Sequence, residues 1–140
     1  MRALPELRRA AGDRAVLRAM HFFADDRRSA EEADALERGD TEGFLALVRE
    51  SGRSSWELLQ NITPTGAVKE QAMAVALAVA ERALGGRGAC RVGGGFAGTI
   101  QAFVPLDMKE SFRSAVESVL VEGSCHILSI RPDGGTVLAG

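Results

Sequence analysis

The chain has 140 residues, of which 46% are hydrophobic and 26% charged, and its formal net charge is −2. These values are typical of one globular domain and give no reason to expect a nucleic-acid or membrane-surface partner. The first residues lack the apolar stretch of a secretory signal, and no apolar run approaches the roughly 20 residues of a membrane span. We therefore expect a single cytoplasmic domain over residues 1–140.

The first half of the chain is predicted to be helical. Apolar residues recur at helical spacing over residues 4–11, and Asp13 is placed to cap a second helix. A further helix is expected over Ser29–Arg38 and another over Thr41–Glu50. The Gly39–Asp40 turn between them offers a glycine to end one helix and an aspartate to cap the next. These two helices should form an αα-hairpin.

Two more helix starts are predicted between residues 54 and 64. Ser54 or Ser55 is placed to cap a short helix over Trp56–Asn61. The Thr63–Pro64 pair fits the cap and first position of a longer helix, which should end at Gly85–Gly86. Many alanines line this longer helix, and they favour close packing on a sheet.

The most distinctive stretch is rich in glycine. Two apolar runs, Ala89–Val92 and Ala97–Val104, flank the sequence Gly93-Gly94-Gly95-Phe96. This pattern predicts a strand, a tight loop and a second strand. Consecutive glycines are costly to order, so they indicate positive φ angles or a close approach to the backbone. Their bare N–H groups could form a concave anion site.

The last third of the chain is predicted to add one helix and two strands. Asp107 and Glu110 have the spacing of a capping box, and Gly123 is expected to close the helix that follows. Strands are expected over Cys125–Ile130 and Thr136–Ala139, joined by a proline–glycine turn. The fold class predicted is α+β, with an antiparallel four-stranded sheet, helices on one face and extra N-terminal helices.

Cysteine and histidine are too sparse to indicate a metal site. Cys90 and Cys125 both fall in strand-like runs, where we expect buried, reduced thiols, although a disulfide between neighbouring strands stays open. His21 and His126 are the only histidines, so no zinc site is expected. His21 is interpreted as a helix residue rather than a catalytic one.

The glycine-rich stretch is similar to the third sequence motif of the galactokinases, which belong to the GHMP family of small-molecule kinases. That motif runs roughly Gly-Ala-Arg-Met-Thr-Gly-Ala-Gly-Phe-Gly-Gly, and Gly93, Gly95, Phe96 and Gly98 fall on its positions. Either Cys90 takes the place of the family's arginine, or Arg91 does and one residue is missing before Gly93. A one-residue slip in a strand reverses the face of each side chain, so the two alignments give Arg91 different roles.

Two other segments carry the same resemblance. Arg18–Phe23 resembles the opening of the galactokinase C-terminal half, and Leu128–Pro132 resembles part of its tail. The sequence shows neither the Gly-Glu-His-Thr-Asp segment nor the Pro-x-x-x-Gly-Leu-Ser-Ser-Ser segment of the N-terminal half. The resemblance therefore covers the C-terminal half of a galactokinase alone, with a GHMP-type fold related to the ferredoxin-like arrangement.

The resemblance also implies a function. A complete galactokinase phosphorylates galactose to galactose 1-phosphate, with ATP and Mg as cofactors and with an N-terminal kinase half that this chain lacks. The chain is then expected to be inactive alone, to bind no cofactor tightly or metal itself, and to self-associate through the exposed interdomain face. The implied nucleotide and substrate loop consists of Gly93, Gly94, Gly95, Phe96, Ala97 and Gly98, with Arg91 as an accessory residue.

Two alternatives remain open at this point. The chain could be a stand-alone α+β module that binds a small molecule or a protein, because a fold does not fix a function. It could also be the C-terminal half of another GHMP kinase that acts on mevalonate, homoserine or a different sugar. The Arg18–Phe23 and Leu128–Pro132 segments favour galactokinase over these relatives.

Overall fold

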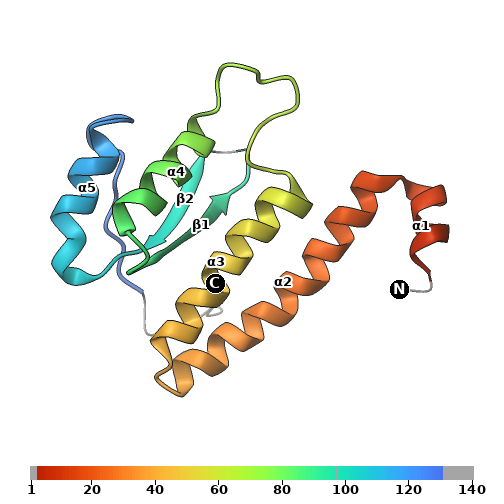
Figure 1. The fold of residues 1–140 in the computed structure, drawn as a ribbon, viewed down its shortest axis with the longest axis horizontal. Helices are drawn as coiled ribbons and strands as arrows, with labels where there is room; N and C mark the ends of the chain where they lie inside the picture. Colours follow the sequence, from red (N-terminus) through yellow and green to blue (C-terminus); the bar gives the residue numbers. More distant parts are fainter. Residues whose placement is uncertain (1–2, 97, 131–140) are drawn as a thin grey trace, which may run out of the picture.

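The computed structural model describes residues 3–96 and 98–130. This part of the chain has an α+β architecture with a two-stranded antiparallel sheet, which confirms the predicted fold class at that level (Figure 1). In chain order the elements are α1 (Leu4–Ala11), α2 (Asp13–Glu37), α3 (Thr41–Ser54), a π-helical turn (Ser55–Leu59), α4 (Ala72–Leu84), β1 (Ala89–Gly94), β2 (Thr99–Phe103), a 3-10 turn (Leu106–Met108) and α5 (Lys109–Glu117).

The helices α2 and α3 form the predicted αα-hairpin. Gly39 adopts a left-handed conformation with φ 70°, and Asp40 Oδ1 accepts a hydrogen bond of 2.8 Å from the Gly43 amide. The C-cap and N-cap predictions at this turn are confirmed. The separate helices expected before it are one continuous helix of 25 residues, since no glycine or proline stands between Asp13 and Glu37.

The two helix starts expected next are wrong. Helix α3 continues into the π-helical turn without a break, so Ser54 and Ser55 lie inside a continuous helical segment and neither acts as a side-chain cap. Helix α4 begins at Ala72 instead of Thr63. Gly66 has φ 88°, and such a left-handed residue interrupts a helix in what would have been its first turn. The predicted C-terminal end at Gly85, with φ 55°, is confirmed.

The glycine-rich stretch folds as the predicted β-hairpin. Strand β1 pairs with β2 from Ala89 opposite Phe103 to Gly94 opposite Thr99, with a bulge between Val92 and Gly94. Gly93 and Gly94 therefore belong to the strand rather than to the loop. Residues 95, 96 and 98 lie in the turn.

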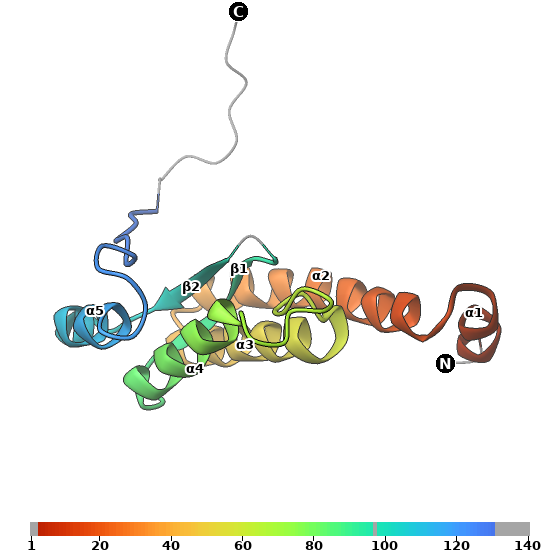
Figure 2. The ribbon, with the colours of Figure 1, turned by 90° about the horizontal axis from the view of Figure 1, so that it is seen from above.

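Helices cover the sheet on one face, and α4 lies across it (Figure 2). The larger hydrophobic core lies between α4, the hairpin and α5, and it contains Ile62, Met73, Leu77, Ala80, Leu84, Cys90, Phe112 and Val116. A smaller cluster joins α2 and α3 to the start of β1. Here Gly52 allows α3 to approach β1, since a Cβ at this residue would lie 3.0 Å from the Cys90 carbonyl oxygen.

The end of the described chain differs from the prediction. Asp107 does not cap α5 but pairs with Arg87 at 2.8 Å. Residues 125–130 form no strand, which corrects the predicted strand Cys125–Ile130, and the predicted strand Thr136–Ala139 lies outside the described residues. Two side chains of α5 form hydrogen bonds with the backbone of Cys125. The Glu117 carboxylate accepts a hydrogen bond of 3.1 Å from the Cys125 N–H, and the Arg113 guanidinium donates one of 3.1 Å to the Cys125 carbonyl oxygen. These hydrogen bonds use backbone N–H and C=O groups that pairing with a neighbouring strand would need.

Candidate functional site

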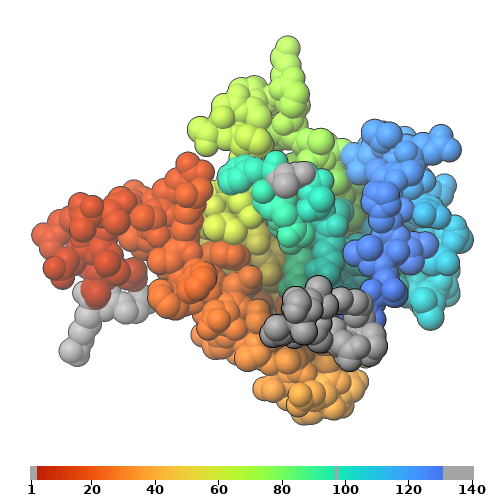
Figure 3. Space-filling view, turned by 180° about the vertical axis from the view of Figure 1, so that it is seen from behind, coloured from red at the N-terminus to blue at the C-terminus, as the bar shows by residue number. Residues whose placement is uncertain are grey.

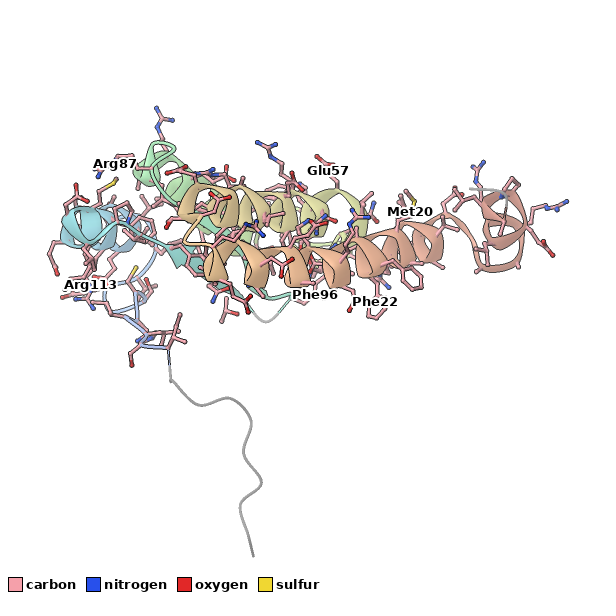
Figure 4. All side chains as sticks on the ribbon, turned by 90° about the horizontal axis from the view of Figure 1, so that it is seen from below. Met20, Phe22, Glu57, Arg87, Phe96 and Arg113 are labelled. Atoms are coloured by element: carbon pink, nitrogen blue, oxygen red, sulfur yellow. The ribbon has the colours of Figure 1, made fainter. Side chains whose placement is uncertain are left out.

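The tip of the β-hairpin is the candidate site. Phe96 has φ 57° and Gly98 has φ 81°, so both turn residues adopt the left-handed conformation. Phe96 is 49% exposed and projects to the same side of the molecule as Phe22 of α2 (Figure 4). Gly93 is also exposed, whereas Gly94 and Gly95 are half-buried. Ala97, the remaining predicted loop residue, lies outside the described residues.

Asn61, which follows the π-helical turn, holds this loop in place. The Phe96 N–H donates a hydrogen bond of 3.0 Å to the Asn61 carbonyl oxygen. A Cβ on Gly95 would lie 2.1 Å from the Asn61 amide nitrogen, so the glycine makes room for that side chain. The Phe96 amide is thus engaged within the chain. Asn61 Oδ1 is buried and has no hydrogen-bond partner among the described residues.

Arg91 lies on the opposite face of β1 from Cys90. Its Nη1 binds the Glu32 carboxylate of α2 at 2.9 and 3.1 Å, and its Nε donates to Gln101 Oε1 at 3.0 Å. Cys90 points into the core, where it is 4% exposed. Arg91 therefore joins the hairpin to α2, and its guanidinium is engaged by the Glu32 carboxylate of the same chain.

A polar seam between α2 and α3 was not predicted from the sequence. His21 Nδ1 lies 2.9 Å from Ser54 Oγ, and Asp25 Oδ2 lies 3.9 Å from His21 Nε2. Arg28 pairs with Asp25 and lies 3.6 Å from Glu50. The signal that could have revealed the seam is the spacing of His21, Arg28 and Glu32, which places all three on one helix face.

The seam resembles a serine–histidine–aspartate arrangement without its chemistry. His21 and Ser54 are each 7% exposed, so a substrate cannot reach the hydroxyl. The distance of 3.9 Å between Asp25 and His21 exceeds that of a hydrogen bond. We interpret these residues as a structural network, in agreement with the sequence-based view of His21.

The described surface includes at least two clefts. One, of about 640 Å³, lies beside α1 and is lined by Pro5, Arg8, Arg9, Gly12 and Asp13. The other, of about 300 Å³, lies between the π-helical turn and α4 and is lined by Gly52, Arg53, Trp56, Glu57, Leu77, Ala78, Glu81 and Cys90. The lining of neither cleft includes a residue of the hairpin turn.

Both cysteines are free thiols; Cys90 is buried as predicted, whereas Cys125 is only half-buried. Burial, with a smaller contribution from the Glu81 carboxylate, raises the pKa of the Cys90 thiol to about 11. The pKa of Cys125 is also raised, first by burial and then by Glu117. A thiol with a raised pKa forms little of the nucleophilic thiolate at neutral pH. Neither cysteine therefore has the lowered pKa of an activated nucleophile.

Residues 3–96 and 98–130 contain no group of three or more histidine, cysteine or acidic side chains that could hold a metal ion. Within the same residues, no helix combines the length and apolar character needed to cross a bilayer. No protein-family model matches the sequence, and no solved structure matches the chain.

Proposed function

We propose that this chain is the C-terminal part of a galactokinase-like sugar kinase, to which it contributes the glycine-rich third motif. In the complete enzyme ATP and Mg would serve the phosphorylation of galactose to galactose 1-phosphate. The observation that supports this proposal is the fold of Gly88–Thr99: the residues that resemble the motif form one hairpin whose turn is exposed at its tip.

The hairpin suits a role in binding phosphate from one side. Catalysis of phosphoryl transfer consists mainly of positioning and of stabilising charge, for which backbone N–H groups serve as fixed donors. The amides around Gly93–Gly95 would supply such donors, while the bond from Phe96 to Asn61 fixes the turn. Arg91, paired with Glu32, would position β1 rather than contact the phosphate.

The proposal includes the finer fold expected from the resemblance. In the complete enzyme, residues 125–130 would leave their contacts with Glu117 and Arg113 and, together with residues 136–139, complete a four-stranded sheet of the GHMP type. The first of these segments carries apolar side chains that are largely exposed, among them Leu128 at 82% and Ile130 at 91%. Such exposure favours a partner for this segment.

The proposal is tested with the complete enzyme, that is, this chain joined to an N-terminal kinase half. We expect Gly94→Val to lower kcat/KM for galactose by about a hundredfold or more, because a branched side chain would displace the backbone at the phosphate. Val68→Ala, a change at a residue that is 83% exposed, serves as the control and should leave turnover unchanged. Thermal unfolding of both variants checks the fold.

Two outcomes would contradict the proposal. Full activity of the Gly94→Val enzyme would make the hairpin a structural turn only. ATP-dependent phosphorylation of galactose by the 140-residue chain alone would contradict the need for a second half. A substrate panel with mevalonate, homoserine and other sugars distinguishes galactokinase from the other GHMP kinases.

The alternative of a stand-alone protein-binding module is favoured by one observation. Phe22 and Phe23 on α2 are 65% and 71% exposed, and solvent-facing aromatic pairs of this kind are typical of interaction surfaces. The coding sequence next to this chain discriminates between the two functions. An upstream segment with the sugar and ATP motifs supports the kinase, and an unrelated segment supports the module.

A further inference from the structure

The two faces of α2 have the reverse of the usual polarity. The face turned toward α3 carries the buried residues His21, Arg28 and Glu32, together with Ala35. The opposite face carries mainly apolar side chains, all of them exposed, and we call it the outer face: Ala15, Ala19, Phe22, Phe23, Asp26, Ala30 and Ala33. A helix normally turns its apolar stripe inward, so this arrangement points to a partner for the outer face.

The outer face is open to solvent in the structure. The Phe22 and Phe23 rings stack edge to face with centroids 5.5 Å apart, and they remain 65% and 71% exposed. Figure 4 shows Phe22 projecting away from the helical layer. Seen from behind, the flank formed by α2 is not covered by the hairpin or by α5 (Figure 3).

Reading the outer face in reverse about the midpoint between Phe22 and Phe23 keeps two of the residue pairs on it the same in kind. Reversal exchanges Phe22 with Phe23, Ala19 with Asp26 and Ala15 with Ala30. In an isologous interface the same patch of each copy is used, so that residue 15 of one copy meets residue 30 of the other and residue 30 meets residue 15. Alanines on both sides of the aromatic pair would let the two helix backbones approach closely.

The charges beside this face are also complementary to themselves. Within α2, residues 13–20 contain two arginines and one acid, whereas residues 21–37 contain two arginines and six acids. In an antiparallel pair, the basic start of one α2 lies against the acidic end of the other. Arg18 and Asp26 are both exposed, and an antiparallel pairing brings Arg18 of one copy close to Asp26 of the other.

We propose that a second copy of this chain binds the outer face of α2, so that the two α2 helices pack antiparallel about a two-fold axis at Phe22 and Phe23. The self-complementary residue order and charge distribution favour a second copy over an unrelated protein. The inference does not depend on the kinase proposal, since it is tested by the size of the chain in solution and not by turnover.

The first experiment measures the mass of the chain by sedimentation or light scattering from about 10 to about 500 µM. We expect a monomer–dimer equilibrium. The double variant Phe22→Ser, Phe23→Ser should weaken it at least about a hundredfold, because buried aromatic anchors dominate such interfaces. Circular dichroism confirms that the variant is folded, and Val68→Ser, with a side chain 83% exposed elsewhere, is the matched control.

A charge exchange tests the orientation. Arg18→Glu should weaken the dimer about tenfold, because it places two acids opposite each other, and adding Asp26→Arg should restore the affinity. A wild-type monomer over the whole concentration range, or a dimer that the double phenylalanine variant leaves intact, would overturn the proposal. So would an Arg18→Glu effect that Asp26→Arg does not reverse.

Cysteine cross-linking gives an independent geometric test, carried out in a Cys125→Ser background. An antiparallel pairing places residue 19 of one copy opposite residue 26 of the other, within the Cα separation that a disulfide needs. A mixture of Ala19→Cys chains and Asp26→Cys chains should therefore form a disulfide-linked pair. Efficient linkage of Ala19→Cys chains with each other would indicate a parallel arrangement and contradict the proposal.

Discussion

The two interior regions of this protein are built on different physical principles. The core between α4, the hairpin and α5 is apolar and buries residues such as Met73, Leu84 and Phe112. The layer between α2, α3 and β1 contains a small apolar cluster, but α2 contributes to it mainly through charged and polar groups. Both regions are buried, yet only the first depends chiefly on the removal of apolar surface from water.

The difference shows what each region contributes. Apolar burial is non-directional and supplies the larger part of the stability. Ion pairs such as Arg91 with Glu32 contribute less net free energy because both charges lose water, but they require a defined geometry. We infer that the apolar core holds the chain folded, and that the polar seam sets the position of α2 along α3 and β1.

The largest effect is expected in the apolar core. Leu84 is 2% exposed, and Leu84→Ala should lower the free energy of unfolding by about 3 kcal/mol through lost burial and a residual cavity. Leu106→Ala, at a residue that is 90% exposed, should change it by less than about 0.5 kcal/mol. Urea unfolding measures both. Equal effects of the two variants would contradict the assignment of the core.

A smaller effect is expected at the ion pair between Arg91 of β1 and Glu32 of α2. Glu32→Ala should cost about 1–2 kcal/mol, because it leaves the partly buried guanidinium of Arg91 without its carboxylate. Adding Arg91→Ala should recover part of the loss, so that a double-mutant cycle yields a positive coupling. The control is Glu31→Ala, which removes the exposed pair with Arg27 and should be nearly neutral. A coupling of zero would show that Arg91 and Glu32 do not stabilise each other, and would contradict the prediction.

The smallest effect is expected at the hairpin turn. Gly95→Ala should cost about 1 kcal/mol, since the new methyl group would displace the side chain of Asn61, which lies 2.1 Å from its Cβ position. The double variant Gly95→Ala, Asn61→Ala should regain part of that loss, because the colliding amide is gone, while a contact of 2.9 Å between the two Cβ positions remains. Thermal unfolding distinguishes the cases. Failure of the second substitution to rescue would show that Gly95 is needed for another reason.

Local signals in the sequence were sufficient for several elements. Gly39 and Asp40 placed the turn between α2 and α3 correctly, and Gly85 placed the end of α4, because such residues act through their own conformation and hydrogen bonds. The hairpin was also predicted correctly, although its glycines were assigned to the loop. Two of them belong to β1 because the bulge after Val92 extends the ladder to Gly94.

Features that depend on tertiary contacts could not be read from the sequence. Asp107 and Glu110 have the pattern of a capping box, but Asp107 pairs with Arg87, which is 20 residues away in the sequence. The segment Cys125–Ile130 was predicted to be a strand, but Glu117 and Arg113 bind the backbone at its start. For the candidate site, the sequence identified the glycine turn and could not reveal that Asn61 packs against it.

The length of α2 has a consequence for the start of the chain. A helix of 25 residues extends about 38 Å, and its first turns run beyond the rest of the molecule (Figure 1). The first buried residue of α2 is His21, and α1 buries none. In the monomer, backbone hydrogen bonds over Asp13–Met20 therefore open locally at a small fraction of the global free energy, and their amide protons exchange with solvent before those of α4.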